Sequence, residues 1–273
     1  MTTRLVAFDL DDTLAPSKSP LDDRMAGLIV RLLDVMQVCV ISGGRFEQFR
    51  EQVIARLPEL GAAAVDRLHL MPTCGTQYYR FADGAWAQQY AEDLSDAEKT
   101  AALAAVEEEA RALGLWEART WGPILEDRGS QITFSALGQT APVDAKKAWD
   151  PSGEKKNTLR AAVQRRLPDL EVRSGGSTSV DITRRGIDKA YGMNRLAELT
   201  GIPFADMLFV GDRLDPEGND FPVVALGIPT HAVRDWQDTA AFVESFLAQD
   251  QDQPPARAHR HTASEAGSGA RAR

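Results

Sequence analysis

Cysteine is scarce in this chain, and its scarcity excludes two classes of protein. Only 2 of the 273 residues are cysteines, Cys39 inside an apolar run and Cys74 beside Gly75. Two cysteines are too few for a disulfide framework or for a zinc site built on thiolates. We therefore expect both side chains to be reduced thiols.

Long apolar runs and an excess of positive charge are also missing. No segment approaches the roughly 18 uninterrupted apolar residues that a membrane helix needs, and the first apolar run meets Asp9 before a signal-peptide core is complete. The 31 Lys and Arg residues face 40 Asp and Glu residues, a net charge of −9, which disfavours binding to a phosphodiester backbone. The sequence thus predicts a cytoplasmic protein that binds neither membrane nor nucleic acid.

What the sequence does contain is an alternation of buried strands with amphipathic helices. Residues 5–8, 38–41 and 207–210 form short and almost continuously apolar runs, which are typical of strands covered on both faces in a parallel sheet. Apolar stripes with helical spacing follow the first two runs, at residues 25–36 and 46–57. This alternation predicts an α/β fold with a Rossmann-like, doubly wound core.

The middle of the chain has a different pattern. Residues 131–136 alternate strictly between polar and apolar side chains, as in a sheet with one solvated face. A capping box at Ser95 and Glu98 indicates the start of a long helix. We therefore expect a core formed by residues 1–80 and 185–248, an inserted α+β domain at 81–184, and a disordered polar tail at 249–273.

Acidic residues follow the first and the last of the apolar runs. Asp9 and Asp11 come directly after the first run, and Gly211-Asp212 and Gly218-Asn219-Asp220 follow the last. Ligands of open α/β sheets bind at the carboxyl ends of the strands, so these carboxylates indicate a site for a hard cation such as Mg²⁺. Taken alone, an Asp-x-Asp pair is equally well explained by a solvated acidic turn.

Two further features suit a bound anion. Ser42-Gly43-Gly44 follows the second apolar run and lets backbone N–H groups approach a phosphate, although a plain strand-to-helix turn has the same composition. Lys189 lies at the start of a later helix. Its charge either balances the acidic residues and a bound phosphate or is simply exposed to solvent.

These motifs together resemble a known family. Asp9-Leu10-Asp11-x-Thr13, Ser42, Lys189 and Gly211-Asp212 with Asn219-Asp220 are similar, in order and context, to the four motifs of the haloacid dehalogenase (HAD) superfamily. The resemblance covers nearly the whole chain before the tail. The inserted domain resembles the C2B cap of subfamily IIB, which contains phosphomannomutases and sugar phosphatases.

The resemblance implies a role for each motif residue. Asp9 is the nucleophile that accepts the phosphoryl group, and Asp11 is the general acid and base. Asp9 and Asp212 bind Mg²⁺ through their side chains and Asp11 through its backbone carbonyl, with Asp220 in the same acidic cluster. Four residues are expected to hold the phosphoryl group or the substrate near it: Ser42, Lys189, Gly43 and Asn219.

Two segments of the insert resemble the cap of the phosphomannomutases. They are residues 126–139 and 175–181. The match implies that three cap residues contact the substrate: Arg128, Ser179 and Asp181.

The chain departs from the mutases at three basic positions. Gln139 and Lys146 stand where the mutases have cap arginines, and Lys18 where they have an arginine after the first motif; we still expect Lys18 and Lys146 to bind substrate. Arginine grips phosphate with a planar fork, whereas lysine offers one compact charge and glutamine none. A mutase binds its sugar by both phosphate ends in turn, so these changes favour a phosphatase.

The sequence therefore predicts a Mg²⁺-dependent phosphatase of a small phosphorylated sugar, as a monomer or as a homodimer formed through the cap. One alternative is a phosphomannomutase-like hexose-phosphate isomerase that uses the same aspartyl-phosphate. Another is a non-catalytic metabolite-binding module on a HAD fold. The acidic charge balance and the large cap argue against a nucleic-acid phosphatase.

Overall fold

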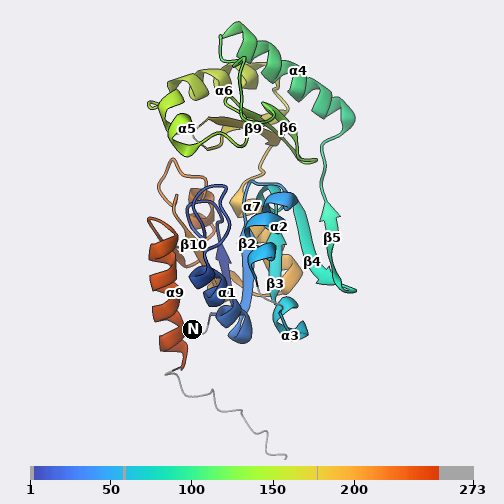
Figure 1. The fold of residues 1–273 in the computed structure, drawn as a ribbon. Coiled ribbons are helices and arrows are strands. Elements are labelled where there is room, and N and C mark those ends of the chain that lie inside the picture. The colour runs from blue at the N-terminus through green and yellow to red at the C-terminus, as the bar shows by residue number, and fades with distance from the viewer. Residues whose placement is uncertain (1–2, 58–59, 177, 252–273) are drawn as a thin grey trace, which may run out of the picture.

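The computed structural model describes residues 3–57, 60–176 and 178–251 (Figure 1). The chain forms two sheets, one of seven strands and one of four. The four-stranded unit lies above the seven-stranded unit in the view of Figure 1. In the described part of the chain, no helix is long and apolar enough to cross a membrane.

The larger sheet is a mixed sheet dominated by parallel strands. Its spatial order is β11 (Thr230–Ala232), β10 (Met207–Gly211), β1 (Leu5–Phe8), β2 (Gln37–Ile41), β3 (Leu68–Met71), β4 (Gln77–Ala82) and β5 (Ala85–Ala91). The strands from β11 to β3 run parallel, and β4 and β5 are antiparallel. The parallel sheet predicted from the three apolar runs is confirmed.

Helices cover both faces of this sheet because its parallel strands are apolar on both sides. Val6 and Phe8 of β1 pack in one cluster with α1 (Asp23–Val35), α2 (Phe46–Gln52) and α9 (Trp236–Gln251). Leu5 and Ala7 pack in the other cluster with α7 (Lys189–Thr200) and α8 (Phe221–Val224). Short elements complete the unit: α3 (Ala62–Val65) and the 3₁₀ turns η1 (Ile54–Arg56), η2 (Thr73–Gly75) and η3 (Phe204–Asp206).

The smaller unit, called the cap below, is an antiparallel sheet covered by helices. Its strand order is β6 (Leu125–Asp127), β7 (Gln131–Ser135), β9 (Ser179–Arg184) and β8 (Leu170–Ser174). Its helices are α4 (Asp96–Ala112), α5 (Val143–Trp149) and α6 (Glu154–Arg166). In Figure 1, α4 and α6 lie on the side of the cap sheet away from the larger sheet. The capping box of Ser95 and Glu98 starts α4, as expected.

The predicted boundaries of the insert and the tail differ from the structure. The insert was expected to start at residue 81, yet β4 and β5 form a hairpin at the edge of the seven-stranded sheet. The hairpin is mostly half-buried or exposed, so it lacks the continuous apolar runs that mark the buried core strands. Helix α9 continues to Gln251, three residues into the predicted tail; residues 252–273 lie outside the described part.

The polar side of the cap sheet is buried, and the expectation of a solvated face was wrong. Gln131, Thr133 and Ser135 on β7 are each only 1–2% exposed. Their side chains bond within the sheet, for example from Thr133 to Asp181 on β9. The face is polar because it lies toward the larger unit, where Ser130 bonds to Thr73.

Candidate active site

A buried lysine bridges two carboxylates at the carboxyl end of the parallel sheet. Asp9 directly follows β1, and its N–H donates to Val210 O at 3.0 Å. Lys189, the first residue of α7, lies with Nζ 2.5 Å from Asp9 Oδ1 and also bonds to Asp220 Oδ1. All three residues are at least 96% buried. The fold thus brings together residues that are 180 positions apart.

Burial and charge act in opposite directions on these groups. Burial raises the pKa of Asp9 well above its usual range although Lys189 lowers it, and Asp220 and Asp212 add to the rise. Burial by itself lowers the pKa of Lys189, but Asp220 and Asp9 outweigh it and the net pKa is raised. The lysine is therefore charged, and the carboxyl groups of Asp9, Asp212 and Asp220 lie around this one cation.

Three carboxylates form a group that fits a hard cation. Asp9, Asp212 and Asp220 each offer an oxygen, and these oxygens lie within 4.8 Å of one another. The buried Thr13 hydroxyl accepts from Asp212 N at 3.1 Å and lies 3.5 Å from Asp9 Oδ2. An all-oxygen donor set is what Mg²⁺ prefers among protein ligands.

Asp11 has a separate set of partners. Its Oδ1 accepts from Lys18 N at 2.7 Å, and its Oδ2 accepts from Lys18 Nζ and Gln48 Nε2, both at 3.0 Å. Burial by itself raises the pKa of Asp11, but Lys18 outweighs it and the pKa is lowered. The chain turns after β1, with Leu14 N donating to Leu10 O, so strand alternation does not govern where the Asp11 side chain lies.

The loop after β2 is shaped to approach an anion. Ser42 is 4% exposed and its hydroxyl accepts from Gly44 N at 3.2 Å. Gly43 is half-buried, and a Cβ there would lie 3.9 Å from the Cys74 sulfur. Cys74 and the buried Cys39 are both free thiols, as expected.

Arg128 links the cap to this loop. Its guanidinium pairs with Glu126 at 2.6 Å, and its Nη1 donates to Gly43 O at 2.7 Å. Its Nη2 lies 3.4 Å from Gln139 Oε1, and Glu126 also pairs with Arg45 of the core at 3.3 Å. The predicted cap arginine is therefore at the site, but its donors are already used by protein acceptors.

Lys146 on the cap lies close enough to Lys18 in the larger unit for their charges to act on each other. Lys146 Nζ, on α5, donates to Gln139 O at 3.0 Å. Burial lowers the pKa of Lys146, and the nearby charge of Lys18 lowers it further while Asp11 opposes this. Lys146 of the cap therefore lies close enough to Asp11 and Lys18 for their charges to change its pKa.

The remaining predicted residues lie on the cap sheet and in the loop after β10. Ser179 bonds to Ser135 at 3.1 Å, and Asp181 accepts from Thr133 at 2.7 Å, both on the buried polar side of the cap sheet. Asn219 is exposed in the turn next to the buried Asp220.

Three residues at the site were not assigned a role from the sequence. They are Thr13, Gln48 and Glu126, which contact Asp212, Asp11 and Arg128 respectively. Thr13 and Glu126 stand within motifs that were noticed. Gln48 lies on α2 among other polar residues, and nothing in its local pattern distinguishes it.

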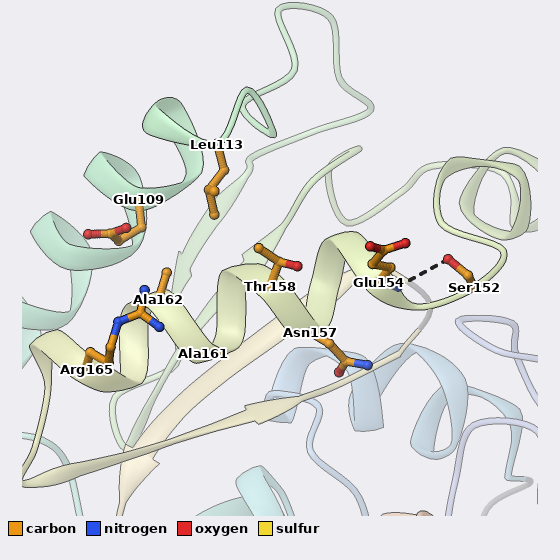
Figure 2. A pocket seen from close by; sticks show the side chains of 9 residues that line it. All are labelled: Glu109, Leu113, Ser152, Glu154, Asn157, Thr158, Ala161, Ala162 and Arg165. Atoms are coloured by element: carbon orange, nitrogen blue, oxygen red, sulfur yellow. Dashed lines mark hydrogen bonds between the residues drawn. The ribbon is translucent and has the colours of Figure 1, made fainter.

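A hollow on the cap lies apart from these residues. It has a volume of about 630 Å³ and lies along α4 and α6, and Figure 2 shows the side chains that line it. The lining residues are Glu109, Leu113, Ser152, Glu154, Asn157, Thr158, Ala161, Ala162 and Arg165. None of these residues was predicted to belong to the site.

Comparisons with known proteins identify the family of the chain. Residues 25–249 match the model of the eukaryotic phosphomannomutase family. Phosphomannomutase from Saccharomyces cerevisiae is 24% identical over 251 residues, which cover 89% of this chain and 94% of the yeast protein.

Solved structures share the fold. The structure of Plasmodium falciparum IMP-nucleotidase matches with a TM-score of 0.70 at 15% identity, over 92% of this chain and 70% of that one. A haloacid dehalogenase-like hydrolase from Bacteroides thetaiotaomicron matches with a TM-score of 0.56 at 16% identity, over 90% of this chain and 100% of the other. The chain is a phosphoryl-transfer enzyme of the HAD type, and it belongs to the eukaryotic phosphomannomutase family.

Proposed function

We propose that the protein is a Mg²⁺-dependent phosphatase of small sugar phosphates that works through an aspartyl-phosphate on Asp9. This proposal rests on one observation, which is how the charged side chain of Arg128 and its neighbour Gln139 are bound in the cap. Arg128 already binds Glu126 and Gly43 O, and Gln139 supplies no charge. An arginine whose fork already binds protein acceptors, beside a neutral glutamine, is poorly suited to hold a second phosphate, which a phosphatase does not need.

The reaction follows from the positions of the site residues. Asp9 Oδ2 attacks phosphorus, because Oδ1 is occupied by Lys189, and the bond from phosphorus to the ester oxygen breaks. Asp11 gives its proton to the leaving oxygen, so it must enter the reaction protonated although Lys18 lowers its pKa in the structure without substrate. Water then attacks the aspartyl-phosphate, Asp11 takes the proton of that water, and phosphate leaves as the Asp9 carboxylate is restored.

Three groups assist the transfer without exchanging a proton. Lys189 and Ser42 hold oxygens of the transferring phosphoryl group. The group of Asp9, Asp212 and Asp220 would hold Mg²⁺, together with the Asp11 backbone carbonyl. The cation supplies positive charge that lowers the repulsion between the attacking carboxylate and the phosphate.

A second candidate is a hexose-phosphate mutase, and the family match favours it. In that reaction the same aspartyl-phosphate returns its phosphoryl group to a sugar instead of to water. Lys146 and Lys18 would then be the cationic groups for the distal phosphate.

One experiment separates the two candidates. The protein is incubated with Mg²⁺ and mannose 1-phosphate, mannose 6-phosphate or glucose 6-phosphate, with and without hexose 1,6-bisphosphate, and followed by ³¹P NMR. We expect inorganic phosphate to accumulate with wild type and with Asp83→Asn, an exposed control, but not with Asp9→Asn. Isomer conversion without phosphate release would instead establish the mutase.

The cytoplasmic location and the oligomeric state remain predictions from the sequence. Light scattering coupled to gel filtration distinguishes a monomer from a homodimer formed through the cap.

A further inference from the structure

We infer that Gln48 is a positioning residue that holds the Asp11 carboxylate for proton transfer, an inference that rests on the proposed function. Gln48 Nε2 donates to Asp11 Oδ2 at 3.0 Å, and Gln48 Oε1 accepts from Lys18 Nζ at 2.6 Å. Lys18 in turn holds both oxygens of Asp11. The three side chains therefore form a closed ring in which each member fixes the other two.

The ring ties two separate loops together. Asp11 and Lys18 belong to the loop after β1, whereas Gln48 is on α2, which follows the loop of Ser42 and Gly44. The Gln48 amide folds back over Gly44, and a Cβ at Gly44 would collide with Gln48 Oε1. The glycine thus provides the space that lets Gln48 reach Asp11.

This arrangement matters for one bond-breaking event. When the ester bond breaks, the leaving oxygen of a sugar must gain the proton of Asp11, because an alkoxide is a poor leaving group. A nitrophenolate leaves without that proton. Misplacing the Asp11 carboxylate by about 1 Å costs on the order of 10²-fold in the rate of this step, and it slows loss of the leaving group only where that group needs the proton.

The test compares leaving groups in the full-length protein with Mg²⁺. Gln48→Leu removes both hydrogen bonds, and Gln48→Glu keeps the acceptor for Lys18 but loses the N–H that Asp11 receives. Arg50→Leu, an exposed position on the same helix, is the matched control. Each variant is assayed with p-nitrophenyl phosphate and with the sugar phosphate from the NMR series that wild type hydrolyses fastest.

We expect both Gln48 variants to lose about 10²-fold in kcat/KM for the sugar phosphate while kcat/KM for p-nitrophenyl phosphate stays within about threefold. The comparison uses kcat/KM because it covers the steps up to loss of the leaving group and excludes the later attack of water, which Asp11 assists for both substrates. KM for the sugar phosphate should change little, because Gln48 acts through Asp11. Equal losses on both substrates, or no loss on either, would overturn the inference and leave the proposed function standing. If wild type hydrolyses neither substrate, the proposed function fails and the inference fails with it.

Discussion

The ammonium of Lys189 lies 2.5 Å from Asp9 Oδ1, and the lysine is only 1% exposed. A buried cation at this distance holds the proposed nucleophile in place and leaves its second oxygen available for the proposed attack. Asp220 anchors the same ammonium from the other side. Asp9, Lys189 and Asp220 are therefore coupled. Replacing any one of them alone should lower the stability of the fold.

Lys189→Met should destabilise the fold as well as abolish activity. It leaves Asp9 and Asp220 buried without their partner, and breaking a buried pair in this way costs about 3–5 kcal/mol. Urea unfolding at pH 7 measures the loss.

A double mutant isolates the charge effect at Lys189. Lys189→Met combined with Asp220→Asn removes one of the stranded carboxylates, so it should be more stable than the sum of the two single changes predicts, by about 1 kcal/mol. Strict additivity would show that Lys189 stabilises by packing alone.

Metal binding should stabilise the wild type and depend on Asp212. Removing Mg²⁺ with a chelator should abolish activity, and returning it should raise both activity and Tm. Asp212→Asn should lose the Tm rise and about 10²-fold in activity. Asp215→Asn, an exposed aspartate of the same loop that pairs with Arg213, should retain both, and an equal loss there would contradict the assignment.

Periodicity predicts the core of this fold well and its edge poorly. Strands 5–8, 38–41 and 207–210 are buried on both faces, so their apolar runs are unambiguous. The hairpin of β4 and β5 is mostly half-buried or exposed, so no continuous apolar run marks it as part of the core. It joins the core sheet by pairing with β3, through Leu70 and Tyr79.

Acid should destabilise the protein through His69. Its ring bonds to Tyr78 and Gln37, both at 2.8 Å, and burial, together with the charge of Arg80, lowers its pKa to about 3. An unfolded histidine titrates near pH 6.5, so below that pH the unfolded state binds the extra proton. Stability should therefore fall as pH drops from about 6.5 toward 3, by at most about 1.4 kcal/mol per pH unit from this group.

His69→Gln checks that pH dependence. The variant lacks the titrating ring, so its free energy of unfolding should fall less steeply between pH 6.5 and pH 4.5 than that of wild type. Urea unfolding at a series of pH values gives both slopes. Parallel slopes would show that His69 does not contribute.

Gln139→Arg should strengthen binding of a second phosphate at the cap. Gln139 lies beside Arg128, and Lys146 donates to its carbonyl, so an arginine there would add a charged fork to this part of the cap. We expect KM for hexose 1,6-bisphosphate to fall about tenfold, equivalent to about 1.4 kcal/mol. Gln89→Arg, an exposed position on β5, is the control, and an unchanged KM in Gln139→Arg would place the distal phosphate elsewhere.

The site was only partly predictable for a physical reason. Asp9, Asp212 and Lys189 follow strands or start a helix, so their convergence follows from sheet topology. The contacts of Gln48 and Glu126 depend instead on how side chains from separate loops and from the cap meet. No local pattern specifies such contacts. The sequence predicts that Arg128 contacts substrate, whereas the structure pairs it with Glu126.

The most direct test of the account is to identify the residue that carries the phosphoryl group. Wild-type protein turning over a sugar phosphate is quenched and treated with borohydride, which reduces an aspartyl-phosphate to homoserine, and the peptide containing residue 9 is analysed by mass spectrometry. The account predicts that the conversion occurs at Asp9 and is absent without substrate. Continued phosphate release with no conversion at Asp9, or conversion at another aspartate, would contradict it.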